Sequence, residues 1–188
     1  MARPRSPEKR QAILRAAVHE IAKTGLGAST ANIAKSANLA EGTLFTYFPT
    51  KEDLLNELYV ELKTDAYRRV NAKFPHHAAL RERVKYIWTE YLLWAMEKPD
   101  DRKASMQLNV SDVITAKTRE RIAGERGAVE QALNEVDKRG AFKDLPSGFA
   151  SSAMAAMQEA VSDTVSKRPR QRAMLIEQGF EAFWRMTE

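Results

Sequence analysis

Residues 29–55 read STANIAKSANLAEGTLFTYFPTKEDLL and decide the fold. The spacing of the apolar residues predicts two short helices, the first capped by Ser29 or Thr30 and the second ended by Pro49. A tight turn at 38–40 separates them, and a longer helix begins directly after the proline. Helices of two turns are marginal in isolation, so we expect neighbouring parts of the chain to hold both in place.

Two short helices joined by a three- or four-residue turn form a helix-turn-helix. Its packing needs a small residue where the helices approach each other, and Ala34 stands at that position. The turn needs a residue that tolerates positive φ, which Asn38 does more readily than most non-glycine residues. Leu39 and Leu44 are predicted to point back into a small core formed with the first helix. The outward face of the second helix is then free to enter a major groove, which is about 12 Å wide.

The outward face of this segment carries side chains suited to DNA. Hydroxyl groups can bond phosphates or base edges, a glycine lets the backbone approach closely, and residues at helix starts can bind phosphates. The predicted DNA contacts are Thr30, Gly42, Thr43, Thr46, Tyr47 and Lys51. Glu41 could accept a hydrogen bond from a cytosine amine, or it could serve only to complement the helix dipole.

The positive charge of the chain is concentrated at its beginning. Residues 1–51 hold eight Lys or Arg against three Glu, whereas the remaining 137 residues hold 22 basic and 22 acidic side chains. This asymmetry is typical of a polyanion-binding end attached to a neutral body, although a solubilising surface is the alternative. Arg3 and Arg5 flank Pro4 and could reach a minor groove; plain disorder is the competing interpretation.

Composition excludes several other classes of protein. The 188-residue chain has no cysteine, three scattered histidines and no apolar run of the ~20 residues needed to span a bilayer. It begins without the apolar segment of a secretory signal, so we expect a cytoplasmic protein. There is no glycine-rich phosphate loop, nucleophile elbow or His-Glu metal pattern, so we expect neither an enzyme nor a metal or cofactor.

Helical periodicity continues through the rest of the chain, with no segment that alternates like a strand. The predicted fold is all-α with about nine helices. The first begins at Ser6 and stops near Gly25, and the two short helices follow it. The later helices are expected over about 50–72, 78–97, 100–110, 113–139, 147–166 and 170–187.

The run IAKSA, followed by GTLFTYFPTKEDLL, resembles the DNA-binding signature of the tetracycline-repressor (TetR) family of bacterial transcription regulators. The resemblance covers about residues 6–66. It implies a DNA-binding domain over 6–66, with the helix-turn-helix at about 29–48, and an effector-binding and dimerisation domain over 67–188. It implies a ligand-responsive repressor of transcription, and it places the phosphate-binding and base-facing positions on Thr30, Thr43, Thr46, Tyr47 and Lys51.

The sequence departs from the family pattern at four positions. Asn38 replaces a usual glycine, and Ala40 replaces a common capping serine, so the second short helix should start less firmly. Phe45 replaces a frequent tyrosine and loses a possible hydroxyl contact with phosphate. Ala31 occupies a position where some members carry a base-contacting arginine. The half-site sequence therefore does not carry over from any relative.

One helix-turn-helix makes too few contacts for a specific site, so we expect a homodimer on a palindromic operator. Small residues on one of the last two helices and aromatic residues on the other suit close packing, although these helices could instead only cap the monomer core. The predicted interface residues are Ala153, Ala156, Ala160, Gly179, Phe180, Phe183 and Trp184.

Apolar and aromatic side chains of the middle helices are candidates for a small-molecule effector site. The resemblance implies such a pocket, and its lining predicts an apolar or aromatic effector, although these residue types are more often simply core. The candidate residues are Trp88, Tyr91, Trp94, Met106, Phe149, Met154 and Met157. The alternative function is a helical scaffold or interaction module that binds polyanions non-specifically.

Overall fold

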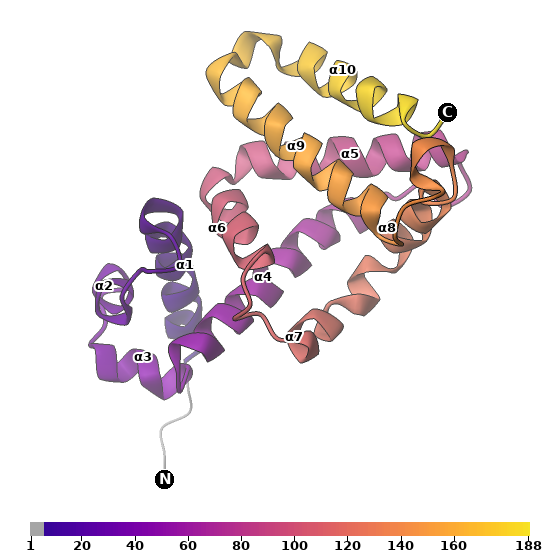
Figure 1. Ribbon diagram of the computed structural model, residues 1–188. Helices are drawn as coiled ribbons and strands as arrows, with labels where there is room; N and C mark the ends of the chain where they lie inside the picture. Colours follow the sequence, from indigo (N-terminus) through magenta and orange to yellow (C-terminus); the bar gives the residue numbers. More distant parts are fainter. Residues whose placement is uncertain (1–5) are drawn as a thin grey trace. The chain divides into compact units, whose positions relative to one another are not determined.

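The computed structural model describes residues 6–188, and within them every regular element is a helix (Figure 1). The elements are α1 (Pro7–Thr24), α2 (Thr30–Ser36), α3 (Glu41–Tyr47), α4 (Lys51–Asn71), α5 (Leu80–Glu97), α6 (Pro99–Asn109), α7 (Ala116–Arg121), α8 (Ala123–Val136), the 3-10 turn η1 (Gly140–Phe142), α9 (Phe149–Lys167), the 3-10 turn η2 (Pro169–Gln171) and α10 (Arg172–Arg185). The predicted all-α fold is confirmed.

The single helix expected over 113–139 is two helices in the structure. Thr115 caps α7 by accepting a hydrogen bond from the Thr118 backbone at 3.1 Å, and α7 ends at Arg121. The next helix carries Gly124 and Gly127 in its first turns, and glycine is a weak helix former. The prediction was therefore wrong about continuity, because apolar periodicity does not register a local break of this kind.

Polar caps set the starts of the helices that surround α3, as predicted. The Ser6 hydroxyl accepts from the Lys9 backbone at the start of α1, and Ser29 does the same for α2. Thr50 and Asp53 bond each other reciprocally, with the Asp53 backbone N–H donating to the Thr50 hydroxyl at 3.0 Å. Each cap of this kind stabilises a helix start by about 1 kcal/mol.

The chain forms two compact units. The first contains the residues up to Asp65 together with Lys98–Ala123, and the second contains Ala66–Glu97 together with Gly124–Glu188. In the first unit α1 packs against both α2 and α6, and α2 packs against α3. Residues 98–123 thus share a compact unit with the helix-turn-helix, although they lie far from it in sequence.

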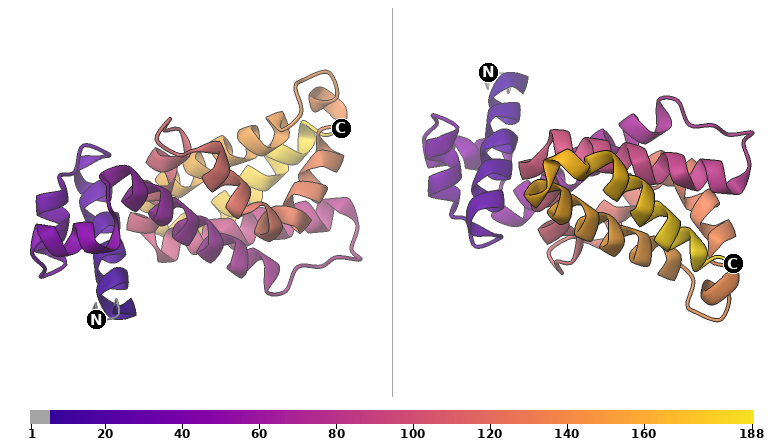
Figure 2. Two further views of the ribbon diagram at one scale, coloured as in Figure 1. Left: turned by 90° about the horizontal axis from the view of Figure 1, so that it is seen from below. Right: turned by 90° about the horizontal axis from the view of Figure 1, so that it is seen from above.

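The core of the second unit is built around Trp88 on α5. Its ring is fully buried and stacks on Phe183 at 6.1 Å between centroids, while its indole N–H donates to the Ile176 carbonyl at 2.9 Å. Helices α9 and α10 lie side by side, and both pack against α5 (Figures 1 and 2). Gly179 allows this close approach, because a Cβ there would come within 2.7 Å of Val161 and 2.9 Å of Trp88.

Candidate nucleic-acid interface

The turn between α2 and α3 has the geometry expected of a helix-turn-helix. Asn38 has φ +55°, and it is the one non-glycine residue with positive φ in the described range 6–188. Its N–H donates to the Lys35 carbonyl at 3.0 Å, and the Leu39 N–H donates to the Ala34 carbonyl at 2.9 Å. These bonds satisfy carbonyls left open at the end of α2. The predicted positive-φ turn is confirmed.

Packing orients α3. Leu44 is fully buried and Ala34 is 1% exposed, so one side of the short helix is fixed against α2 and the core of the first unit. On the remaining surface Glu41, Gly42, Phe45 and Thr46 are exposed. The predicted contacts Thr43 and Tyr47 are half-buried. All five predicted DNA contacts on α3 therefore keep some accessible surface, and burial of Leu44 holds the helix from the opposite side.

Hydrogen bonds to neighbouring elements hold several of these side chains. The Thr30 hydroxyl donates to the Glu41 carboxylate at 2.5 Å, joining the start of α2 to the start of α3. The Tyr47 hydroxyl accepts from the Ser6 backbone N–H at 2.9 Å. The Lys51 ammonium donates to the Leu26 carbonyl at 2.7 Å. Sequence spacing gave no sign of these contacts, because each partner is distant along the chain and is brought close only by folding.

The start of α3 has no side-chain cap at Ala40, as its replacement of serine led us to expect. Thr46 donates its hydroxyl to the Gly42 carbonyl at 3.1 Å, a bond within the same helix. Phe45 is 40% exposed, so α3 presents a large apolar side chain to solvent. The sequence comparison had noted only that this residue lacks the hydroxyl of the tyrosine it replaces. Arg3 and Arg5 lie outside the described residues.

The seven residues predicted for an effector site differ in how far they are buried. Trp88, Trp94 and Met154 are buried, whereas Met106 is 44% exposed and Phe149 is 45% exposed. Tyr91 and Met157 are half-buried. Met106 belongs to the first compact unit and the other six belong to the second.

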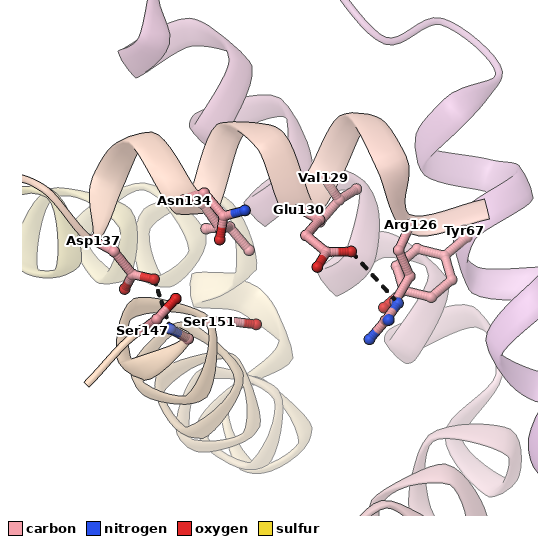
Figure 3. A pocket seen from close by; sticks show the side chains of 10 residues that line it. Tyr67, Arg126, Val129, Glu130, Asn134, Asp137, Ser147 and Ser151 are labelled. Atoms are coloured by element: carbon pink, nitrogen blue, oxygen red, sulfur yellow. Dashed lines mark hydrogen bonds and ion pairs between the residues drawn. The ribbon is translucent and has the colours of Figure 1, made fainter. Parts of the chain in front are cut away.

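A pocket of about 330 Å³ in the second unit is lined by a different set of residues (Figure 3). Most of them lie on α8 or at the start of α9, and they are Tyr67, Arg126, Val129, Glu130, Leu133, Asn134, Asp137, Ser147, Gly148 and Ser151. The sequence pattern gave no signal for this site, because polar residues on a helix surface are typical of any solvated face.

The charged side chains of the pocket differ in whether they already have hydrogen-bond partners within the chain. The Asp137 carboxylate accepts from the Gly148 and Ala150 backbone N–H groups at 2.6 and 2.9 Å, and so caps α9. The Nε atom of Arg126 lies 3.9 Å from Oε2 of Glu130, which is close enough for an ion pair but too far for a hydrogen bond (Figure 3). This Nε is buried and has no hydrogen-bond partner. A buried donor left unbonded is unfavourable, so a ligand that accepts from Arg126 would be stabilised there.

The residues predicted for a dimer interface fall into two groups. Phe180, Phe183 and Trp184 are buried in the core of the second unit, and Gly179 faces Val161 and Trp88 of the same chain. On α9, Ala153 is half-buried, while Ala156 and Ala160 are exposed one turn apart. The accessible part of the predicted set is therefore the small-residue surface of α9.

Within the described residues, no helix combines the length and apolarity that crossing a bilayer requires.

Residues 13–58 match the family described as bacterial regulatory proteins, tetR family. The chain is 32% identical over 80 residues to the fatty acid metabolism regulator protein of Bacillus subtilis, a match covering 42% of this chain and 41% of that protein. The chain spans about two fifths of the length of the curated relatives it matches: 40% of one and 41% of the other.

Solved structures extend the likeness to nearly the whole chain. A putative tetR family transcription regulator from Shewanella sp. PV-4 has a TM-score of 0.80 at 25% identity, covering 96% of this chain and 97% of that one. The regulator FadR from Bacillus subtilis, solved in complex with stearoyl-CoA, has a TM-score of 0.66 at 19% identity, covering 92% and 96%. The second of these likenesses concerns the fold alone.

Proposed function

Because the chain belongs to the tetR family of DNA-binding transcriptional regulators, we propose that it is a repressor that binds a palindromic operator as a homodimer and is released by a small-molecule effector. The observation that carries the proposal is the α2–Asn38–α3 geometry, in which a buried Leu44 fixes one side of α3 and leaves the other accessible. A helix held in this way can enter a major groove without unfolding or rotating.

In this proposal phosphate contacts fix the position of α3 and base contacts give specificity. Lys51 uses one of its three N–H donors on the Leu26 carbonyl, so the other two can reach phosphate. The Tyr47 hydroxyl accepts from Ser6 and keeps its own proton to donate to a phosphate oxygen. Thr43, Thr46 and the Gly42 backbone complete the surface that meets the groove.

We propose that the homodimer forms through α9 and α10. Ala156 and Ala160 are exposed one turn apart, and small side chains let two helices approach closely. The aromatic residues Phe180 and Phe183 of α10 are fully buried in the core of the same unit, which leaves the small residues of α9 as the accessible part of the predicted interface. Two copies would place two α3 helices for half-sites about 34 Å apart.

We propose the α8–α9 pocket as the effector site. Trp88 and Met154, which the sequence suggested, are already packed in the core, whereas the pocket offers about 330 Å³ and an unbonded Arg126 Nε. The fold accommodates a ligand in at least one relative, which was solved with stearoyl-CoA. An effector that binds the non-DNA conformation about 100-fold more tightly would shift the equilibrium by about 2.7 kcal/mol.

Selection from a randomised duplex library with the purified full chain tests the DNA-binding proposal. A palindromic consensus retained at physiological salt is the expected result, whereas the alternative, non-specific polyanion binding, gives no consensus and is lost steeply as salt rises. Thr46→Ala should weaken binding to the selected site. Thr24→Ala is the matched control, because Thr24 also donates to the carbonyl four residues before it but lies at the end of α1.

Release of the operator complex by fractions of a cell extract tests the effector proposal. A fraction that releases the wild-type protein should fail to release Arg126→Ala. The exposed Arg139→Ala, which removes the same charge outside the pocket lining, should respond like the wild type. If no fraction releases the wild-type protein from the operator, the proposed release by an effector is wrong. The proposal of operator binding does not depend on this result.

A further inference from the structure

The start of α3 carries a carboxylate on a surface that is otherwise suited to a polyanion. Glu41 is the first residue of α3 and is exposed. Among residues 6–188 it makes no ion pair, and its one side-chain hydrogen bond is with Thr30. A carboxylate cannot accept from phosphate and is repelled by it, so its favourable partners on DNA are hydrogen-bond donors of the bases.

Thr30 fixes where that carboxylate lies. Thr30 is the first residue of α2, and its hydroxyl donates to Glu41 Oε1 at 2.5 Å. Both ends of the contact stand on backbone held by the α2–α3 turn, so the Glu41 side chain is ordered before DNA arrives and loses less conformational freedom on binding. The second carboxylate oxygen, Oε2, stays free to accept.

The contact also changes the role of Thr30. A threonine hydroxyl has a single proton to donate. While it donates to Glu41, it cannot donate to a phosphate, which is the role that the sequence suggested. Thr30 is therefore a positioning residue for Glu41.

The pattern of the major groove decides which base a lone carboxylate accepts from. Only the cytosine N4 and adenine N6 amines donate there, while guanine and thymine present acceptors. The adenine amine lies beside the N7 acceptor, which repels a carboxylate, whereas the cytosine amine has no acceptor next to it on the same base.

We infer that Glu41, held by Thr30, reads the amine of one cytosine in each half-site; this rests on the proposed function, in which α3 enters the major groove. The base preference at that position then follows from the Glu41 side chain. The rest of the consensus is set by other contacts.

Library selection with Glu41→Gln tests this assignment. The wild type should select cytosine at one symmetric pair of positions, and Glu41→Gln should shift that pair toward adenine, because an amide bonds both N6 and N7 of adenine. Glu20→Gln is the matched control, since Glu20 also accepts from a hydroxyl, that of Ser36, but lies on α1. It should leave the consensus unchanged. A Glu41→Gln consensus identical to the wild type at every position would overturn the inference.

A duplex in which that cytosine is replaced by 2-pyrimidinone, which lacks the 4-amino group, gives a second test. The wild type should bind it about tenfold less tightly, in the range of a single base contact. Glu41→Ala should bind both duplexes equally, and Thr30→Val, which keeps the shape but removes the hydroxyl, should lose most of the discrimination. An equal loss for the wild type and Glu41→Ala would show that another group reads the amine.

The two proposals fail in distinguishable ways. A wild-type protein that selects no palindrome contradicts the proposed function and, with it, the role of Glu41. A palindrome without a position sensitive to Glu41 contradicts the role of Glu41 alone.

Discussion

The Tyr47 hydroxyl, at the end of α3, lies 2.9 Å from the backbone nitrogen of Ser6 and accepts its hydrogen bond. Ser6 is also the cap of α1, because its hydroxyl accepts from the Lys9 N–H. One tyrosine therefore ties α3 to the first residue of the described chain. The same hydroxyl still has a proton available for a phosphate.

Tyr47→Phe should weaken both folding and operator binding. Loss of one part-buried hydrogen bond should lower the free energy of unfolding by about 0.5–1.5 kcal/mol. Chemical unfolding and a binding titration at fixed salt measure the two effects. Tyr86→Phe, which removes a hydroxyl in the second unit, is the control, and its operator affinity should equal that of the wild type. An unchanged affinity for Tyr47→Phe would remove Tyr47 from the interface.

Asn38→Ala should destabilise the helix-turn-helix, because the residue at this position has φ +55°. A left-handed backbone with a Cβ is disfavoured by about 1–2 kcal/mol, which asparagine offsets in part and glycine avoids. Asn38→Gly should thus be at least as stable as the wild type. The exposed Asn32→Ala, within α2, serves as the control for loss of an amide. A higher denaturant midpoint for Asn38→Ala than for Asn38→Gly would contradict the expected backbone strain at this position.

Gly179→Ala should destabilise the second unit by about 1–3 kcal/mol, the usual range for overpacking a core. The added methyl would lie 2.7 Å from Val161 and 2.9 Å from Trp88. Gly127→Ala is the matched control: it is also a helical glycine but has nothing within 4 Å of the new Cβ, so it should gain up to about 1 kcal/mol from helix propensity. Equal unfolding midpoints for the two variants would show that α10 can move away from α5.

The contribution of Glu57 to stability should depend on pH. The hydrogen bond from Arg121, with further attraction from Arg10, holds the pKa of Glu57 below its usual value of 4.5. A carboxyl group whose pKa is lower in the folded state stabilises the fold above its unfolded pKa, and this is lost as pH falls through the folded pKa. Glu57→Gln should therefore be less stable than the wild type at neutral pH.

Thermal unfolding between pH 7 and pH 3 measures this difference, which should narrow over the acidic end of the range. Glu61→Gln removes a more exposed carboxylate from the same helix and should show a smaller gap at neutral pH. A gap between Glu57→Gln and the wild type that stays constant with pH would mean that the two arginine contacts do not depend on the ionised carboxylate.

The sequence determined the local structure of this protein. Caps at Ser6 and Thr50, the proline after α3, and the positive-φ asparagine at 38 all act through backbone groups within a few residues of each other, so they can be read along the chain. The same holds for the apolar spacing that separates buried Leu44 from the exposed residues beside it. The helix-turn-helix was predictable for this reason.

Tertiary structure alone decided which side chains cooperate. The bonds from Thr30 to Glu41, from Ser6 to Tyr47 and from Lys51 to Leu26 join residues 11 to 41 positions apart, and no period or motif records them. Likewise, Phe180 and Phe183 have the same apolar character whether they face a partner or their own core, and only packing around Trp88 placed them inside. A residue type fixes what a side chain can bond, and the fold fixes which partner lies within reach.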